Sequence, residues 1–592
     1  MTRAFTGSNR SALLEATDTL LENDTAIRPN SANRRGRSRS AAHRQTRLVG
    51  ASRPNAVTSI IRRQRSSRAR RLQHLALALL ALGAACRLLR YALRFPYWGD
   101  EAFLCVNFLN RDYLGLTRQL ECFQVAPVLF LWGELTVLRL LGTSEWALRL
   151  MPFVAGLASL GLFCRLARVT LGPRAAVLAI GLLAVSRWPV TMCTSVKPYS
   201  LDLFFSLALL VSAVDYLRRP EKIARLALLT FLVPVALLSS YPAVFVAGGV
   251  SLVLLPAVWR SGRFALAWFV AYNLVMAGTF VGVYLLVGLN QLDTDTGSVE
   301  RYMQDYWKHG FPPGGAWQFT AWLMQVNAGR LMAYPIGDGR GGSILTLLVF
   351  LVGASVLIAR GRWSLLGLCL LPFALNFVAA ALRRYPYGGC CRISQHLAPA
   401  ICMVTATGLS RLIDWTSRST AIRLRGVGIC CGAFALFGLG QLVADSVKPY
   451  RDKEALWSRK LTQVLLSHGA ADAVVIGNRQ GDVESLLRWH LGRLDKEMTW
   501  EGNVDWERLE RDRGDLWYVS IWSGAASTPQ AERHGPPLSR NRPGWTRLDH
   551  VTYTLPSWAA DQPDRQCEVS RWVWRTNGYR NDRSPAPGAW PP

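Results

Sequence analysis

Acidic side chains are scarce in this sequence, which contains 39 Asp and Glu residues against 68 Lys and Arg residues and has a formal net charge of +29. Acids are fewest inside the apolar runs, where Asp202 lies near the end of one run. A transporter or lipid flippase needs ionisable residues in mid-span along its pathway. The scarcity therefore disfavours transport, which is kept as the alternative function.

Ligands for a metal or a nucleotide are also missing from the sequence. His309 has no partner at metal-binding spacing, so no metal ligands are assigned, and a divalent metal is an open cofactor only. No G-x-G-x-x-G follows the first expected strand of the C-terminal part, so no nucleotide site is assigned. The 12 Cys residues form no disulfide framework, although Cys105 and Cys122 share one expected outer loop and could pair.

Apolar side chains dominate what is present: half of the residues (50%) are hydrophobic, and 22 are Trp. Apolar runs of about 18 residues or more recur, as in a polytopic helical membrane protein. Much of the basic excess lies in short loops and in residues 1–71, which are rich in Arg and Ser. This distribution indicates the positive-inside rule and anionic lipid headgroups rather than nucleic acid. Residues 1–71 are expected to be disordered and cytoplasmic.

The hydropathy pattern predicts about eleven transmembrane helices between residues 72 and 444, followed by a small C-terminal α/β domain over 445–592. The expected spans lie near 72–93, 146–166, 175–192, 199–217, 223–240, 242–258, 264–288, 343–359, 363–382, 395–412 and 424–444. The long outer loops are then 94–145, 187–198, 289–342 and 383–394. In the C-terminal domain, helices are expected over 454–468 and 484–491, and strands over 473–477, 516–521 and 551–555.

The apolar segment 125–141 decides the topology. If it crosses the membrane, the Arg-rich short loops are divided between the two sides or fall outside. If it lies in the outer interface, every such loop falls on the cytoplasmic side, which satisfies the positive-inside rule. Glu134 within the segment also fits an interfacial helix better than a span. We therefore expect an interfacial helix and an extracytoplasmic C-terminal domain in a cell (inner, cytoplasmic) membrane.

Chemistry-bearing residues gather in the expected outer loops. Asp100 and Glu101 follow the aromatic stretch 95–98 at the end of the first span. The candidate site residues are Asp100, Glu101, Glu121, Gln124, Lys197, Tyr199, Arg384 and Arg392. Acids beside cations on one membrane face suit an anionic lipid-linked substrate next to a general base. Asp100 and Glu101 could instead only cap a helix, since acids favour helix N-termini.

The order of these features resembles the GT-C membrane glycosyltransferases. A first span that ends in an Asp-Glu pair is followed by a Pro-containing interfacial helix and by residues 141–145 with Arg149. Lys197-Pro198-Tyr199 is similar to the Arg-Pro-Tyr that opens a span in such proteins. The branch that it resembles is glycosyltransferase family 39, of the dolichyl-phosphate-mannose:protein mannosyltransferase type, with the lipid A aminoarabinose transferases as relatives. The resemblance covers about 95–215 and, loosely, 383–410.

This resemblance implies transfer of a mannose-like hexose or similar sugar from a polyprenyl-phosphate donor to a lipid, glycan or protein acceptor at the outer face. It implies that Asp100 is the general base and that Glu101 orients the acceptor or assists a metal. Gln124 stands where relatives often have His or Glu, and Lys197 replaces Arg. Both departures leave the identity of the donor and the acceptor open.

Overall fold

The structure is a computed structural model of the 592-residue chain. It describes residues 56–292, 297–337, 342–467, 473–476, 481–492, 497–500, 504–512, 515–523, 545–555 and 565–574. Most of the expected disordered segment, residues 1–55, lies outside the described residues.

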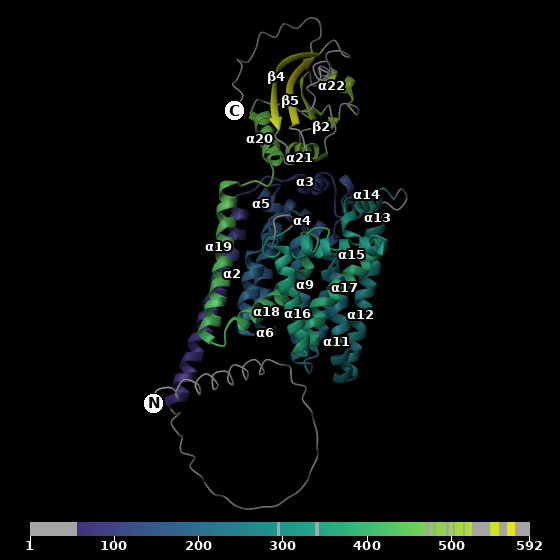
Figure 1. The fold of residues 1–592 in the computed structure, drawn as a ribbon. Helices are drawn as coiled ribbons and strands as arrows, with labels where there is room; N and C mark the ends of the chain where they lie inside the picture. Colours follow the sequence, from purple (N-terminus) through teal and green to yellow (C-terminus); the bar gives the residue numbers. More distant parts are fainter. Residues whose placement is uncertain are drawn as a thin grey trace, which may run out of the picture.

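Apolar helices form one bundle, at one end of which a small sheet lies (Figure 1). Eight helices are long and apolar enough to cross a membrane, and three shorter apolar helices lie between them in the sequence. The helices are α2 (Ala56–Ala92), α6 (Leu150–Thr170), α7 (Pro173–Val185), α9 (Tyr199–Arg218), α10 (Ala224–Ser239), α11 (Ala243–Ser261), α12 (Arg263–Val283), α16 (Ser343–Ala359), α17 (Trp363–Ala381), α18 (Ala398–Thr416) and α19 (Thr420–Val447). The prediction of a polytopic α-helical membrane protein is confirmed.

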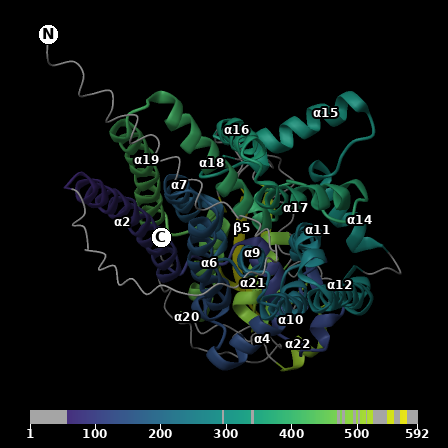
Figure 2. The ribbon, with the colours of Figure 1, turned by 90° about the horizontal axis from the view of Figure 1, so that it is seen from below.

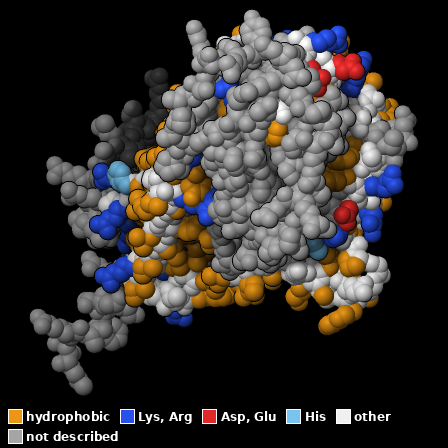
Figure 3. All heavy atoms as spheres, turned by 90° about the horizontal axis from the view of Figure 1, so that it is seen from above, with side chains coloured by type: hydrophobic (Ala, Val, Ile, Leu, Met, Phe, Trp, Pro, Cys, Tyr) orange, Lys and Arg blue, Asp and Glu red, His pale blue; other side chains and the backbone are white. Residues whose placement is uncertain are grey.

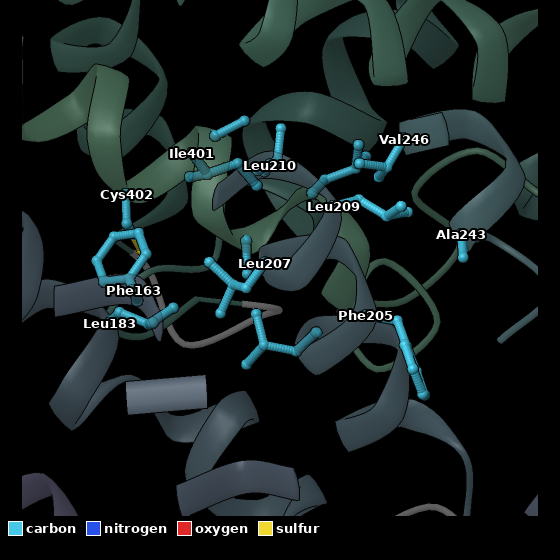
Figure 4. Packing of buried hydrophobic residues seen from close by; sticks show 14 of the residues in the cluster. Phe163, Leu183, Phe205, Leu207, Leu209, Leu210, Ala243, Val246, Ile401 and Cys402 are labelled. Carbon is cyan, nitrogen blue, oxygen red and sulfur yellow. The ribbon is translucent and has the colours of Figure 1, made fainter. Parts of the chain in front are cut away.

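Helix α9 lies at the centre of the bundle (Figure 2). It is buried along most of its length, as expected for a helix that is apolar on all sides. Its Leu207, Leu209 and Leu210 lie among apolar side chains from four neighbouring helices (Figure 4). These neighbours include Phe163 of α6, Leu183 of α7, Val246 of α11, and Ile401 and Cys402 of α18. Lys197 immediately precedes this helix, so the packing of α9 fixes one part of the site.

The outer helices expose apolar side chains, as lipid-facing helices do. On α12, Leu274 and Leu286 nearby are exposed, and on α19 Ile429 and Leu436 are exposed. Seen from the end that carries the sheet, hydrophobic side chains form much of the margin of the described surface (Figure 3).

Two glycines let α16 and α18 approach closely. A Cβ atom at Gly353 would lie 1.9 Å from the carbonyl oxygen of Val404, and one at Gly408 would lie 2.0 Å from that of Val349. Small residues allow such backbone contact between membrane helices. The contact fixes α18, whose N-terminal end follows the segment that contains Arg392.

The basic loops lie at one end of the bundle, and the segment that contains Asp100 and Glu101 lies at the other. Arg165 and Arg225 both pair with Asp215, and Arg174 and Arg423 both pair with Asp414, where α6, α9 and α18 end. Helices α3 (Gly99–Cys105), α4 (Val128–Leu141) and α5 (Glu145–Leu148) lie at the other end, which the sheet also adjoins (Figure 1). Helix α4 does not run from one end of the bundle to the other.

The C-terminal part contains a five-stranded mixed sheet with strand order β2-β1-β3-β5-β4. Strand β1 is parallel to β2 and β3, whereas β5 is antiparallel to β3 and β4. The strands are β1 (Ala473–Ile476), β2 (Glu497–Trp500), β3 (Asp515–Ser523), β4 (Trp545–Leu555) and β5 (Arg565–Trp574), and the helices are α20 (Lys453–Ser467), α21 (Gly481–Gly492) and α22 (Trp506–Asp512). The expected α/β composition is observed, with two strands and one helix that the sequence pattern did not reveal.

Helix α21 packs directly on α3. The rings of Trp489 and Tyr97 meet edge to face with centroids 5.7 Å apart, and both side chains are fully buried. Leu109 lies against Gly492 at the end of α21. The C-terminal part is thus anchored beside the acidic pair rather than at a distance from it.

Candidate active site

Helix α3 points its two adjacent acids in different directions. It begins after Trp98, whose backbone is extended, so that Asp100 and Glu101 both lie in the first turn. Successive residues of an α-helix are about 100° apart around its axis. The side chain of Glu101 is fully buried, whereas that of Asp100 is 20% exposed.

Two cations share the carboxylate of Asp100. Lys197 Nζ lies 3.1 Å from Asp100 Oδ1, and Arg392 Nη1 donates to Asp100 Oδ2 over 2.9 Å. Burial acts to raise the pKa of Asp100, but Lys197 and Arg392 outweigh it, so this pKa lies below its ordinary value. Asp100 is therefore ionised at neutral pH and held by charge-assisted hydrogen bonds.

Gln124 also joins this cluster. Lys197 Nζ donates to Gln124 Oε1 over 2.6 Å, and Gln124 Nε2 donates to the carbonyl oxygen of Cys122 over 3.0 Å. Cys122 and Phe123 both have positive φ values, 57° and 53°, a conformation that is strained for residues other than glycine. This turn directs Gln124 towards Lys197. Cys105 and Cys122 do not form the disulfide that their shared loop allowed, and Cys122 Sγ instead lies 3.6 Å from Ser485 Oγ.

Aromatic side chains surround Arg392. Its Nη2 donates to the hydroxyl of Tyr306 over 3.0 Å, on helix α14 (Ser298–Tyr306). Its guanidinium carbon lies 5.4 Å from the Trp98 ring centroid and 5.2 Å from that of Trp307. Aromatic rings from two separate segments of the chain thus contact one cation.

Glu101 has a different set of partners. Its Oε2 accepts from Arg149 Nη2 over 2.7 Å and from the Trp98 backbone N–H over 3.3 Å. Its Oε1 accepts from Arg149 Nε over 3.2 Å and from the Val196 backbone N–H over 2.7 Å. One buried carboxylate thus joins the start of α3, the start of α6 and the segment that contains Lys197.

The remaining candidates from the sequence, Glu121, Arg384 and Tyr199, do not bind Asp100 directly. Glu121 forms an ion pair with Arg488 of α21, and Arg384 pairs with Glu300 on α14 over 3.1 Å. Both pairs lie apart from the hydrogen bonds of Asp100, and Arg384 is well exposed, at 59% of its side chain. Tyr199 begins α9 two residues after Lys197 and lies close enough to Arg392 to affect its pKa. Burial tends to lower the pKa of Arg392, but the electrostatic interactions with Asp100 and then Tyr199 raise it.

The residues around Asp100 do not fit a divalent metal. In the described part of the chain, no three His, Cys, Asp or Glu side chains come together as a metal-binding group. Both oxygens of Asp100 face cations, and those of Glu101 are taken by Arg149 and backbone N–H groups.

Comparison with known proteins identifies the fold. Residues 125–285 match the model of the dolichyl-phosphate-mannose-protein mannosyltransferase family. The structure is similar to ArnT from Cupriavidus metallidurans bound to undecaprenyl phosphate, with a TM-score of 0.50, 13% identity, and coverage of 83% of this chain and 97% of that chain. It is also similar, with a TM-score of 0.41 and 13% identity, to the oligosaccharyltransferase AglB from Archaeoglobus fulgidus in complex with an inhibitory peptide and a dolichol-phosphate, covering 70% of this chain and 64% of that one. No curated protein matches the sequence.

The chain has the fold of the GT-C membrane glycosyltransferases, and its residues 125–285 match a glycosyltransferase family model. The resemblance to glycosyltransferase family 39 is confirmed over residues 125–285, which lie partly beyond the stretch on which the sequence resemblance rested. An identity of 13% to the solved structure shows the fold alone.

Proposed function

We propose that this enzyme transfers a sugar from a polyprenyl-phosphate donor to an acceptor hydroxyl, with Asp100 as the general base. One observation carries the proposal. A partly exposed carboxylate is shared by Lys197 and Arg392 at the end of the bundle that holds α3. ArnT, which has the same fold, is described with bound undecaprenyl phosphate, a ligand of the chemistry proposed here.

The two cations supply a phosphate site. Lys197 and Arg392 have side chains that are 7% and 9% exposed, and a buried phosphate needs charge-assisted partners of this kind. A guanidinium can hold two phosphate oxygens at once, while an ammonium acts as a point charge. Tyr306, which already holds Arg392, keeps the guanidinium in place when the phosphate binds.

The chemistry needs one base. An acceptor hydroxyl is a poor nucleophile at neutral pH, whereas a phosphate is a good leaving group. Asp100 removes the hydroxyl proton while the acceptor oxygen attacks the anomeric carbon from the side opposite the phosphate. The bond between that carbon and the phosphate oxygen breaks, and its electrons remain on the phosphate. Direct displacement inverts the centre, so a β-linked donor gives an α-linked product.

Donor binding activates the base. With Lys197 and Arg392 on its oxygens, Asp100 has a lowered pKa and is a weak base. A phosphate that binds these cations draws their positive charge away from Asp100, and the pKa of the carboxylate then rises towards its ordinary value. Asp100 therefore becomes an effective base only when the donor is present, which disfavours unproductive chemistry in its absence.

Glu101 acts by positioning rather than on substrate. Both of its oxygens are engaged with Arg149 and with the backbone of Trp98 and Val196, and it has no exposed surface. It fixes α3 relative to the segment that contains Lys197. The expectation that Glu101 orients the acceptor directly is replaced by this indirect role.

The site faces the extracytoplasmic side of a cell membrane, because the Arg-rich short loops lie at the opposite end of the bundle. An impermeant thiol reagent applied from outside should label Leu114→Cys, in an exposed position near α3, and not Gly361→Cys, between α16 and α17. The cysteines of the wild type give the background. The opposite labelling pattern rejects this orientation.

Turnover tests the proposed function itself. Purified enzyme in lipid nanodiscs should transfer label from a radiolabelled polyprenyl-phosphate hexose to a hydroxyl acceptor and release polyprenyl phosphate. Nucleoside diphosphate sugars should not serve as donors. Failure to use any polyprenyl-phosphate sugar, together with ATP-independent movement of the lipid across the bilayer, supports the flippase alternative instead.

A further inference from the structure

Arg451 enters the site from the far end of the sequence. It lies between α19 and α20, in the segment that connects the bundle to the sheet. Its guanidinium carbon is 3.4 Å from the ring centroid of Trp98, and that of Arg392 is 5.4 Å from the same ring. Trp98, which lies two residues before Asp100 in the sequence, therefore contacts two arginines.

Among the described residues, Arg451 forms no direct ion pair, and Asp100, Glu101 and Asp452 act on it only through longer-range electrostatics. Its Nη1 is buried and forms no hydrogen bond to the described residues. Burial and then the charge of Arg392 lower the pKa of Arg451. The neighbouring Asp452 attracts Arg451 electrostatically, but its Oδ1 accepts from the backbone N–H of Ala455 at 2.7 Å. A buried cation beside a second cation is costly unless an anion lies between them.

The charges of the site leave room for such an anion. Lys197, Arg392 and Arg451 are three cations near Asp100, and Asp452 is a second carboxylate near Arg451, so the cations outnumber these two carboxylates by one. Glu101 and Arg149 neutralise each other and do not alter this excess. A donor phosphodiester carries one negative charge, and the released phosphate monoester carries nearly two at neutral pH. The attraction between these cations and the phosphate therefore grows as the phosphate gains negative charge during transfer.

We propose that Arg451 binds the phosphate of the lipid donor next to Lys197 and Arg392, and stabilises the charge that grows on it during transfer. This inference rests on the proposed function. As the bond from the anomeric carbon to the phosphate oxygen breaks, its electron pair stays on the phosphate, while the hydroxyl proton moves to Asp100. A fixed cation aimed at that growing charge favours the transition state over the bound substrate.

The assignment gives the C-terminal part a role in catalysis. Arg451 is placed by the end of α19 and by α20, and α21 is packed on α3. The phosphate site is therefore completed only when the C-terminal part is docked. Relative to Lys197, Arg451 should affect kcat more than KM, because its interaction strengthens as the charge develops.

The test compares Arg451→Gln with Arg459→Gln. Arg459 lies on the neighbouring helix α20 and pairs with Glu145 over 3.5 Å, so its substitution weakens docking without removing a cation from Trp98. Arg451→Gln should lower kcat and the affinity for sugar-free undecaprenyl phosphate by about tenfold to a hundredfold, the range of a charged hydrogen bond. The donor KM should change less. Arg451→Lys, which keeps the charge, should recover part of both losses. This recovery would show that the losses in Arg451→Gln come from the missing charge and not from misfolding of the site.

Three outcomes overturn the inference. If Arg451→Gln keeps the kcat and the undecaprenyl phosphate affinity of the wild type, Arg451 is not part of the phosphate site. If Lys197→Gln loses donor affinity in the same experiment, the proposed function still stands. An equal loss in Arg459→Gln assigns the effect to docking. A wild-type enzyme that neither turns over a polyprenyl-phosphate sugar nor binds undecaprenyl phosphate rejects both the inference and the proposed function.

Discussion

The two faces of α3 differ sharply although their acids are adjacent in the sequence. On one face, Glu101 is fully buried against Arg149 and the backbone. On the other, Asp100 remains 20% exposed and faces Lys197 and Arg392, which no other carboxylate in the described part of the chain pairs with. The first face contains a closed ion pair, and the second contains more cations than its carboxylate can neutralise.

Two adjacent acids in one helical turn are therefore suited to different roles, Glu101 to structure and Asp100 to chemistry. A closed buried ion pair has no capacity left for a substrate, but removing one partner leaves an uncompensated charge. An incompletely neutralised cluster can exchange one anion for another. The helix-capping interpretation therefore fits Glu101, and the catalytic interpretation fits Asp100. The following changes test this separation.

The largest effect is expected on the closed face. Arg149→Met leaves Glu101 buried without its cation, and should lower the free energy of unfolding by about 3–5 kcal/mol. Turnover should fall as well, because Glu101 holds the segment of Lys197. The double variant Arg149→Met/Glu101→Gln should recover much of the stability. Thermal unfolding in detergent measures both, and single and double variants with equal melting temperatures contradict the role of the pair.

Asp100→Asn should act on chemistry alone. Asparagine keeps the size and part of the hydrogen bonding but cannot accept the proton, so turnover should fall by about 10²–10⁴-fold. Donor binding should be retained or tightened, since the carboxylate no longer competes for Lys197 and Arg392. Full turnover at saturating donor and acceptor shows that Asp100 is not the base.

Lys197→Met and Arg392→Gln should weaken donor binding by about 1.5–3 kcal/mol each, the scale of a hydrogen bond to a charged group. Arg384→Gln is the matched control, because Arg384 pairs with Glu300 and lies apart from Asp100. Isothermal titration with undecaprenyl phosphate measures the change. Equal affinity for all three variants removes both cations from the phosphate site.

The pH profile of kcat/KM offers a smaller shift. The pKa of Asp100 in the free enzyme is lowered, so activity should be lost only as the pH falls below the ordinary range of aspartate. Lys197→Gln removes one cause of that lowering, and the acidic limb should move to higher pH. A limb that stays in place in this variant indicates that another group controls it.

Glu134→Gln should have the smallest effect on activity. Burial and the nearby Glu101 raise the pKa of Glu134 well above its ordinary value, and neither of its oxygens has a hydrogen-bond partner among the described residues. A raised pKa means that the folded protein binds this proton more tightly than the unfolded chain does, so the wild type loses stability as the pH rises above the ordinary pKa of glutamate, and the Gln variant does not. Stability measured at low and neutral pH separates the two proteins, while turnover should match. A large loss of turnover assigns Glu134 to the chemistry.

Hydropathy was sufficient to locate the helices of the bundle, because a lipid environment leaves the backbone few alternatives. It also indicated that Asp100, Gln124, Lys197 and Arg392 share one membrane face, and the structure brings these four together. Glu121 and Arg384 share that face but are drawn away by Arg488 and Glu300. Hydropathy predicts how deep in the membrane a residue lies, but not where it lies within that plane. Which residues pair there depends on how the helices pack.

The contributions of Arg149 and Arg451 could not be predicted in the same way. Arg149 was noted as part of a motif, yet nothing in the sequence indicated that it pairs with Glu101. Arg451 follows the last helix of the bundle and reaches the site because α19 lies beside α2, where Arg90 and Asp445 pair over 2.6 Å (Figure 2). In the sheet, β1 was found because its four residues are a continuous apolar run, whereas β2, of the same length, was missed because it mixes charged, polar and apolar side chains.

The contact of α16 with α18 also has a consequence for how this sequence can vary over evolution. Neither Gly353 nor Gly408 has room for a single methyl group, since each faces a backbone carbonyl that cannot rotate away. Functional descendants of this chain should therefore keep both glycines, or change them together with a wider spacing of the two helices. Because α18 follows directly from the segment that holds Arg392, such a respacing would also change the position of that cation. Glycine at these two positions is thus a sequence marker by which distant relatives with the same close packing of the two helices can be recognised.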